Sequence, residues 1–95
     1  MPWVQIQKAE QVSWSDYERI AQAIGEAPPA GLILHAAGEV DGRWQAVSVW
    51  ESRAAFEAFR EERVLPAVRA VLGDELAAAG PPPEEWFEVK HLIKV

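Results

Sequence analysis

Two hydrophobic periodicities alternate along the chain and predict its elements. Apolar and polar residues alternate with a period of two, which is typical of strands, over 3–10 and 85–95, and the largely apolar segments 31–40 and 43–51 are also interpreted as strands. Apolar residues recur at helical spacing over 14–24 and again from 53 onward. The resulting order of strand, helix, strand, strand, helix, strand is the ferredoxin-like order. We therefore expect an α+β fold, with one antiparallel sheet and helices on one of its faces.

Capping and helix-breaking residues mark the ends of the helical regions. Ser13 and Ser52 can cap the N-termini of the two helices, and Gly25 is a plausible end for the first. Pro66 ends or kinks the second helix, expected from Ser52 to about Arg63, or begins another at its first position. A further apolar stripe at helical spacing comprises Leu65, Val68, Leu72, Leu76 and Ala79.

The strongest local signal is Asp41-Gly42, a dipeptide typical of a two-residue hairpin turn with positive φ. Such a turn fixes the strand register, which places His35 opposite Ser48 and Ile33 opposite Trp50. Directly opposed residues share a face of the sheet. One face would then carry Ile33, His35, Ala37, Trp44, Ala46, Ser48 and Trp50, and the other Leu32, Leu34, Ala36, Val47 and Val49.

Both faces of this hairpin are mostly apolar, although helices can cover only one of them. An antiparallel sheet with one face in water carries polar residues on that face. We therefore expect the second face to meet another subunit, so that the protein is a homodimer. The alternative is that the chain itself folds over that face, for which 95 residues leave little material.

The face that carries His35 has the composition of a ligand pocket. Ala37, Ala46 and Ser48 are small, whereas Trp44 and Trp50 are large, so a hollow between them is expected. His35 and Ser48 would offer polar groups inside it. The alternative for the histidine is a core residue that is hydrogen-bonded to the neighbouring serine.

Composition and charge exclude several classes of protein. The chain of 95 residues makes one domain, 1–95, and its net charge of −6 disfavours nucleic-acid and anionic-membrane binding. Without cysteine it lacks thiolate chemistry, and no spacing of histidines or carboxylates indicates a metal site. No segment resembles a signal peptide or a membrane span, so we expect a cytoplasmic protein. Glu84 and Glu85 are expected to be solvated surface residues.

The segment Val49-Trp50-Glu51-Ser52, which leads into a helix with an early aromatic residue, Phe56, resembles the antibiotic biosynthesis monooxygenase (ABM) family. More broadly, the order of elements is similar to that of the dimeric α+β barrel superfamily. The resemblance implies a dimer whose two sheets pack face to face. It also implies a pocket between sheet and helices in each subunit, with the tryptophan that matches Trp50 in or beside it.

The resemblance implies small-molecule chemistry, since some members oxidise polycyclic aromatic phenols without metal or flavin and others degrade haem. The haem degraders have a histidine iron ligand in their second helix, where this chain has Phe59 and Arg60, so no haem or other cofactor is expected. We expect a cofactor-independent oxygenase, cyclase or isomerase of secondary metabolism, or else a non-catalytic dimeric binding or assembly module. The candidate site residues are His35 as the catalytic residue and, around the substrate, Trp50, Trp44, Ser48 and Tyr17, with Arg60 a further possibility.

Overall fold

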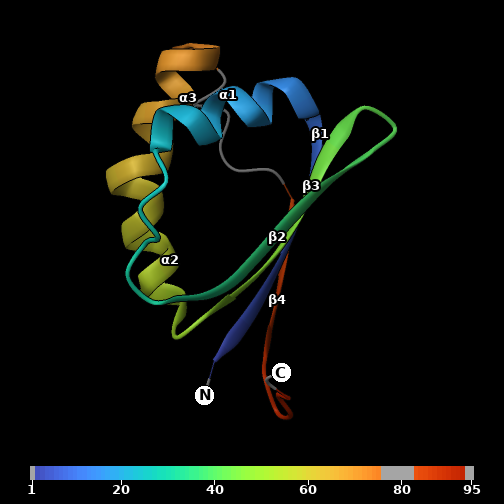
Figure 1. Cartoon of the computed structure of the whole chain (residues 1–95), viewed down its shortest axis with the longest axis vertical. Coiled ribbons are helices and arrows are strands. Elements are labelled where there is room, and N and C mark those ends of the chain that lie inside the picture. The colour runs from blue at the N-terminus through green and yellow to red at the C-terminus, as the bar shows by residue number, and fades with distance from the viewer. Residues whose placement is uncertain (1, 76–82, 94–95) are drawn as a thin grey trace.

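The computed structural model describes residues 2–75 and 83–93, except for the side chains of residues 10 and 11. Its four strands form one antiparallel sheet in the order β2-β3-β1-β4 (Figure 1). The strands are β1 (Trp3–Ser13), β2 (Leu32–Val40), β3 (Arg43–Trp50) and β4 (Glu84–Glu88). This is the ferredoxin-like arrangement that the sequence predicts.

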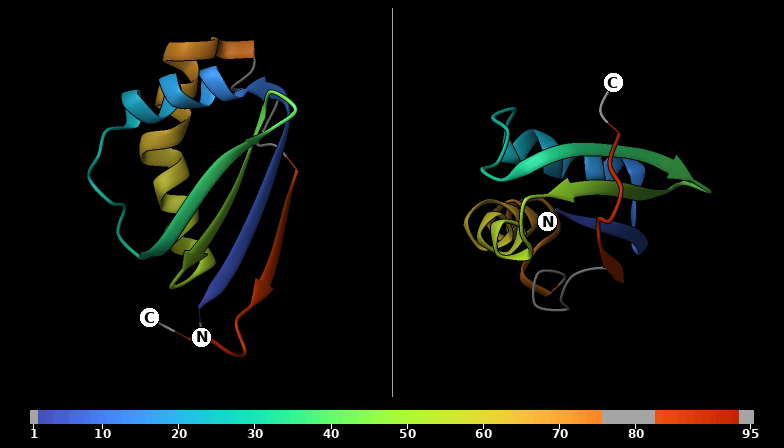
Figure 2. Two further views of the ribbon diagram at one scale, coloured as in Figure 1. Left: turned by 45° about the vertical axis from the view of Figure 1, so that its right-hand side comes forward. Right: turned by 90° about the horizontal axis from the view of Figure 1, so that it is seen from below.

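The helices are α1 (Trp14–Ile24), α2 (Arg53–Phe59) and α3 (Leu65–Leu72), with the π-helical turn η1 (Arg60–Val64) joining the last two. Figure 2 shows all of them on one side of the sheet, as expected. Both predicted caps are present, because the Ser13 and Ser52 hydroxyls each accept a backbone N–H at 3.1 Å. In the described part of the chain, no helix is long and apolar enough to cross a membrane.

The chain stays helical through Pro66, which lies in the first turn of α3. Proline has no N–H and crowds the carbonyl one turn before it, so the preceding turn widens into η1. There the N–H of Leu65 bonds to the carbonyl of Arg60, five residues earlier. Of the three possibilities for Pro66, the structure confirms the start of another helix, and α3 then ends before Gly73 at φ 93°.

The last strand is shorter than predicted, since β4 ends at Glu88 rather than continuing to 95. Glu88 pairs with Trp3, the first residue of β1, and the N–H of Val89 bonds to the carbonyl of Pro2 at 2.8 Å. The neighbouring strand therefore ends there, and residues 90–93 have no β1 backbone to pair with; the last two residues of the predicted strand, 94 and 95, lie outside the described residues. The predicted stripe residues Leu76 and Ala79 lie outside the described residues.

The central hairpin has the predicted two-residue turn, with φ of 51° at Asp41 and 80° at Gly42. His35 pairs with Ser48 as expected. The expected pairing of Ile33 with Trp50 is wrong, because an irregularity between residues 32 and 34 brings Leu32 opposite Trp50 instead. Leu32 thereby turns toward the helices, while Ile33 is left exposed.

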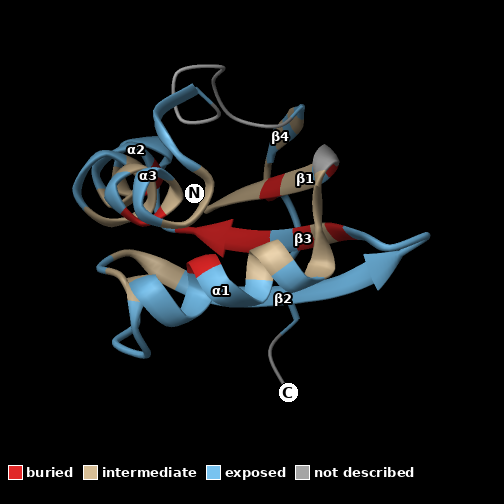
Figure 3. Cartoon of the chain, turned by 90° about the horizontal axis from the view of Figure 1, so that it is seen from above, coloured by how far each residue is buried: buried red, intermediate tan, exposed pale blue. Residues whose placement is uncertain are grey.

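Helices cover one face of the sheet and leave the other face exposed. β3 is largely buried between β1 and β2, whereas β2 is an exposed edge strand (Figure 3). Under the helices Trp44 packs on Ala9 and Ala46, and Trp50 contacts Phe56 edge-on at 5.5 Å. On the other face, exposed apolar side chains lie along the sheet: Leu34, Val47 and Phe87. The predicted uncovered apolar face is therefore present in this chain.

Candidate functional site

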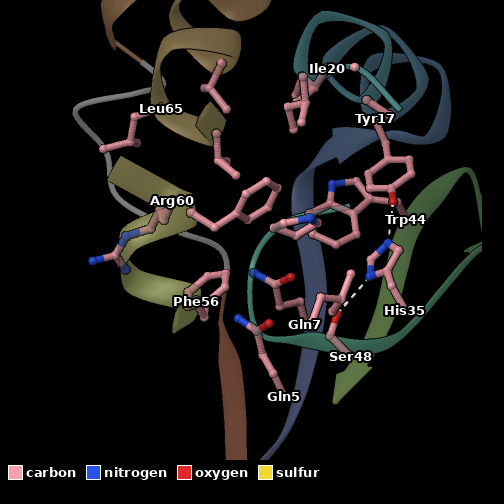
Figure 4. A pocket seen from close by; sticks show the side chains of 18 of the residues that line it. Gln5, Gln7, Tyr17, Ile20, His35, Trp44, Ser48, Phe56, Arg60 and Leu65 are labelled. Atoms are coloured by element: carbon pink, nitrogen blue, oxygen red, sulfur yellow. Dashed lines mark hydrogen bonds between the residues drawn. The ribbon is translucent and has the colours of Figure 1, made fainter. Parts of the chain in front are cut away.

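A cavity of about 840 Å³ lies between the sheet and the helices (Figure 4). This is within the range of sites that enclose drug-sized ligands. Its helical side is apolar because the stripes of α1, α2 and α3 point into it, with residues such as Ile20, Phe59 and Leu65. Its sheet side holds two groups of polar side chains. One lies on α1, β2 and β3, and the other on β1 and β4.

The first polar group is a chain of three side chains: Tyr17, His35 and Ser48. The Tyr17 hydroxyl oxygen lies 2.8 Å from Nε2 of His35, and Nδ1 of His35 lies 2.8 Å from Oγ of Ser48 (Figure 4). The hairpin register brings the histidine and the serine together, and α1 places the tyrosine above them. Tyr17 is held in turn between the rings of Trp14 and Trp44, at 5.1 and 5.0 Å.

Burial shifts both titratable groups of this chain toward their neutral forms. His35 is exposed at the edge of β2, but its ring nitrogens are shielded by Tyr17 and Ser48, and this desolvation lowers its pKa below 6.5. Desolvation likewise raises the pKa of Tyr17 above 10.0. At neutral pH the site therefore holds a neutral imidazole beside a neutral phenol. An unprotonated ring nitrogen of His35 can then accept a proton.

The second polar group centres on Glu84. Its carboxylate accepts hydrogen bonds from the side-chain amides of Gln5 (3.0 Å) and Gln7 (3.5 Å), and from the indole of Trp86 (2.9 Å). Gln5 also accepts the indole N–H of Trp50 at 3.1 Å. Gln5 and Trp50 are 1% and 2% exposed, so this group is rigidly packed against the cavity.

The structure brings all the sequence-derived candidates to one cavity, which is lined by Tyr17, His35, Trp44, Ser48 and Trp50. Arg60 lines it as well, but Figure 4 shows its guanidinium pointing away from the other labelled side chains.

Sequence reasoning missed the second polar group. Gln5 and Gln7 lie on the opposite face of β1 from Val4 and Ile6, as their alternation in sequence indicates, yet the glutamines face inward. The expectation that Glu84 is a solvated surface residue is wrong, because it bonds to the buried Gln5. The sequence signal for this group is the pair Gln5 and Gln7, two polar residues on one face of a strand. The pair indicates a buried polar group only once it is known that this face of β1 lies under the helices.

The residues of this cavity do not fit a histidine-ligated haem. The helical segment 53–72 contains no histidine. His35 reaches the cavity, but both its ring nitrogens are already hydrogen-bonded. Within the described ranges, no group of three or more metal-ligating side chains lies close enough together to hold a metal ion.

Comparisons with known proteins give matches in structure only. No protein-family model and no curated protein sequence matches the chain. A variant of MhuD with two manganese protoporphyrin IX bound per active site has a TM-score of 0.62 at 22% identity, over 98% of this chain and 99% of that chain. SnoaB, a cofactor-independent oxygenase from Streptomyces nogalater, has a TM-score of 0.54 at 17% identity, over 97% and 94%.

A third similar structure is the haem-degrading protein Rv3592 from Mycobacterium tuberculosis, in its haem-free form. Its TM-score is 0.51 at 22% identity, over 99% of this chain and 100% of that chain. These neighbours share the ABM fold, which confirms the fold that the resemblance in the sequence implies. The chain thus has an ABM-like fold of the ferredoxin-like, α+β type.

Proposed function

We propose that this chain is a small-molecule-binding ABM-like protein, a single domain over 1–95, whose cavity takes a bulky aromatic or polyketide-like metabolite. The observation that carries the proposal is the cavity of about 840 Å³, with apolar helices on one side and the Tyr17–His35–Ser48 chain on the other. Trp44 and Trp50 supply flat surfaces in the same wall, on which a ring can stack. The fold neighbours, which include a cofactor-independent oxygenase, support this class of function.

The chemistry that this site favours is removal of a proton from a ligand hydroxyl. When Nδ1 of His35 donates to Ser48, Nε2 is free to accept the Tyr17 proton. Tyr17 can then take the proton of a ligand phenol as it gives its own to His35. The imidazolium so formed can release its proton to water, because His35 is exposed at the sheet edge. The ligand is left as an electron-rich anion.

Such an anion reacts with oxygen in a cofactor-independent oxygenase, or rearranges in a cyclase or isomerase. An anthrone is a suitable oxygenase probe, since its enol is a polycyclic phenol. One molecule of anthrone and one of O₂ give one anthraquinone and one water, so no further reductant or oxidant is needed. We propose this use of the site in secondary metabolism in the cytoplasm, with His35 as the proton acceptor.

The second candidate is a non-catalytic dimeric module that binds a ligand or only assembles. The uncovered apolar face with Leu34, Val47 and Phe87 favours assembly as a homodimer in either case. Oxygen uptake and product analysis with anthrone separate the two candidates. Stoichiometric anthraquinone that depends on His35 supports the enzyme, whereas ligand binding without turnover of any tested phenol supports the module.

Binding is tested by calorimetry with 2-naphthol and with its methyl ether, 2-methoxynaphthalene. We expect Tyr17→Phe and His35→Ala each to weaken 2-naphthol binding by about tenfold, the worth of one well-made hydrogen bond. His91→Ala is the matched control, because His91 is exposed and does not line the cavity. Equal affinity of all four proteins for 2-naphthol would contradict the assignment of the site.

A spectral titration with haem tests the proposal that the cavity works without this cofactor. We expect no sharp, stoichiometric Soret band, since His35 is engaged at both ring nitrogens. A sharp Soret band that His35→Ala abolishes would overturn the proposal that the cavity works without haem.

A further inference from the structure

The carboxylate of Glu84 governs how the amides of the cavity are presented. Glu84 lies opposite Gln7 across the β1–β4 pair, behind the cavity wall rather than in it. Its Oε2 accepts from Nε2 of Gln5 at 3.0 Å and from Nε2 of Gln7 at 3.5 Å. An ionised carboxylate can only accept hydrogen bonds. It therefore turns the N–H side of both amides toward itself.

The orientation of Gln5 is fixed from both sides. The indole N–H of Trp50 can only donate, so its partner at 3.1 Å must be the Gln5 carbonyl oxygen. That leaves the amide nitrogen for Glu84. Because both ends are engaged and the residue is 1% exposed, Gln5 is held in one orientation. It connects Glu84 to the ring of Trp50.

Gln7 differs from Gln5 in having one end free. It lines the cavity and is only partly buried, and its Nε2 points to Glu84. Within 2–75 and 83–93, no side chain donates a hydrogen bond to its carbonyl oxygen. Figure 4 shows the two amides side by side, between Phe56 and the Ser48–His35 pair. Gln7 therefore commits one of its two N–H groups to Glu84 and has a carbonyl oxygen that can accept from whatever occupies the cavity.

We infer that Glu84 is a positioning residue that makes the β1–β4 side of the cavity select ligands with a hydrogen-bond donor there. A hydroxyl or amino group can donate to the Gln7 oxygen. An ether, carbonyl or carboxylate meets that oxygen as a second acceptor, and a carboxylate also meets the charge of Glu84. Together with the Tyr17–His35 side, the cavity takes an aromatic ligand with hydroxyl or amino groups at both ends. This inference rests on the proposed function.

The test compares 2,6-dihydroxynaphthalene with 6-methoxy-2-naphthol by calorimetry, because methylation of one hydroxyl removes one donor and adds only a methyl group. We expect the wild-type protein to bind the diol about tenfold more tightly, the worth of one hydrogen bond. In Glu84→Gln the Gln7 amide is free to turn its N–H to the methoxy oxygen. Affinity for the methyl ether should then rise about threefold and the preference should fall to about twofold or less. General damage to the fold would not raise an affinity.

Glu85→Gln is the matched control, since it makes the same chemical change one residue away, at an exposed position on the other face of β4. It should keep the tenfold preference. Gln7→Leu is a second variant, expected to lose the preference while Glu84 stays in place. If Gln7→Leu keeps the preference, the inference is overturned whether or not Glu84→Gln folds.

The outcomes separate this inference from the proposed function. If wild type binds both naphthols equally, or if the folded Glu84→Gln and Gln7→Leu variants keep the full preference, the donor selection is overturned and the cavity remains a ligand site. If wild type binds neither compound, the proposed ligand site and this inference are both overturned.

Discussion

The two faces of the sheet differ in what they bury and what they expose. The face under the helices carries Trp44 and Trp50 together with polar residues, of which Gln5 and Ser48 are 1% and 3% exposed. The face away from the helices carries aliphatic and aromatic side chains, of which Val47 is 42% and Phe87 52% exposed. A sheet that folded only to bury apolar side chains would not keep Gln5 and Ser48 on its covered face while it leaves Val47 and Phe87 exposed on the other.

This difference indicates what each face is for. Buried polar groups cost stability unless they are paired, and all the fully buried side-chain polar atoms of the described residues have a partner. A wall that keeps such groups beside a cavity is arranged for recognition rather than for packing alone. The bare apolar face, in turn, needs a cover, and a second copy of the chain is the cover that we propose.

The largest effect should come from a charge on the uncovered face. Val47→Asp places a carboxylate where the proposed dimer buries an apolar side chain, which costs several kcal/mol. Because Val47 is exposed within one chain, the variant should still fold but become monomeric in light scattering. Ala54→Asp, on the exposed side of α2, should leave the dimer intact. A monomeric wild type at micromolar concentration would contradict the proposed cover.

A smaller loss should follow from removing a polar group of the covered face. Gln5→Leu leaves the Trp50 indole N–H without its partner and takes one donor from Glu84. We expect a loss of about 2 kcal/mol in the free energy of unfolding, measured with denaturant. Gln22→Leu, at an exposed position of α1, should change it by less than about 0.5 kcal/mol. If both variants lose the same free energy of unfolding, the buried hydrogen bonds of Gln5 do not contribute to stability as we expect.

Ser48→Ala tests a second buried polar group of the covered face. It removes the hydrogen-bond partner of Nδ1 of His35. The cost to stability should be about 1 kcal/mol. Binding of 2-naphthol should weaken as it does in His35→Ala, since the ring loses its orientation. Unchanged binding would place Ser48 outside the site.

The smallest effect should be a dependence of stability on pH. Burial lowers the pKa of His35 in the folded chain below 6.5, so the unfolded chain binds more protons as the pH falls through that value. The stability that neutral His35 contributes is therefore present above pH 6.5 and is lost as the pH falls toward the lowered pKa. His35→Gln should flatten this part of the melting-temperature curve. A curve that His35→Gln does not alter would contradict the shift.

Sequence pattern was sufficient where the structure depends on neighbours along the chain. Asp41-Gly42 determined the register that pairs His35 with Ser48, because a two-residue turn leaves no freedom. The irregularity at Ile33 was not predictable, since it depends on where the loop before β2 meets the end of β3. There the N–H of Glu51 bonds to the carbonyl of Gly31 at 2.8 Å.

The second polar group shows where such inference stops. Gln5 and Glu84 are 79 positions apart, and only the pairing of β1 with β4 brings them together. A hydrophobicity pattern marks Val4 and Ile6 as the inner side of β1, because it assumes that the apolar side faces the helices. Here the polar side faces them, and that choice depends on the whole sheet.

The most direct test of the account is a crystal structure of the protein with 2,6-dihydroxynaphthalene. We predict the ring system inside the cavity, with one hydroxyl within hydrogen-bond distance of Tyr17 or His35 and the other near the Gln7 carbonyl oxygen. The face with Leu34 and Val47 should be covered by a second copy. Ring density on that apolar face, with the cavity filled only by water, would contradict the assignment of the covered polar face as the site.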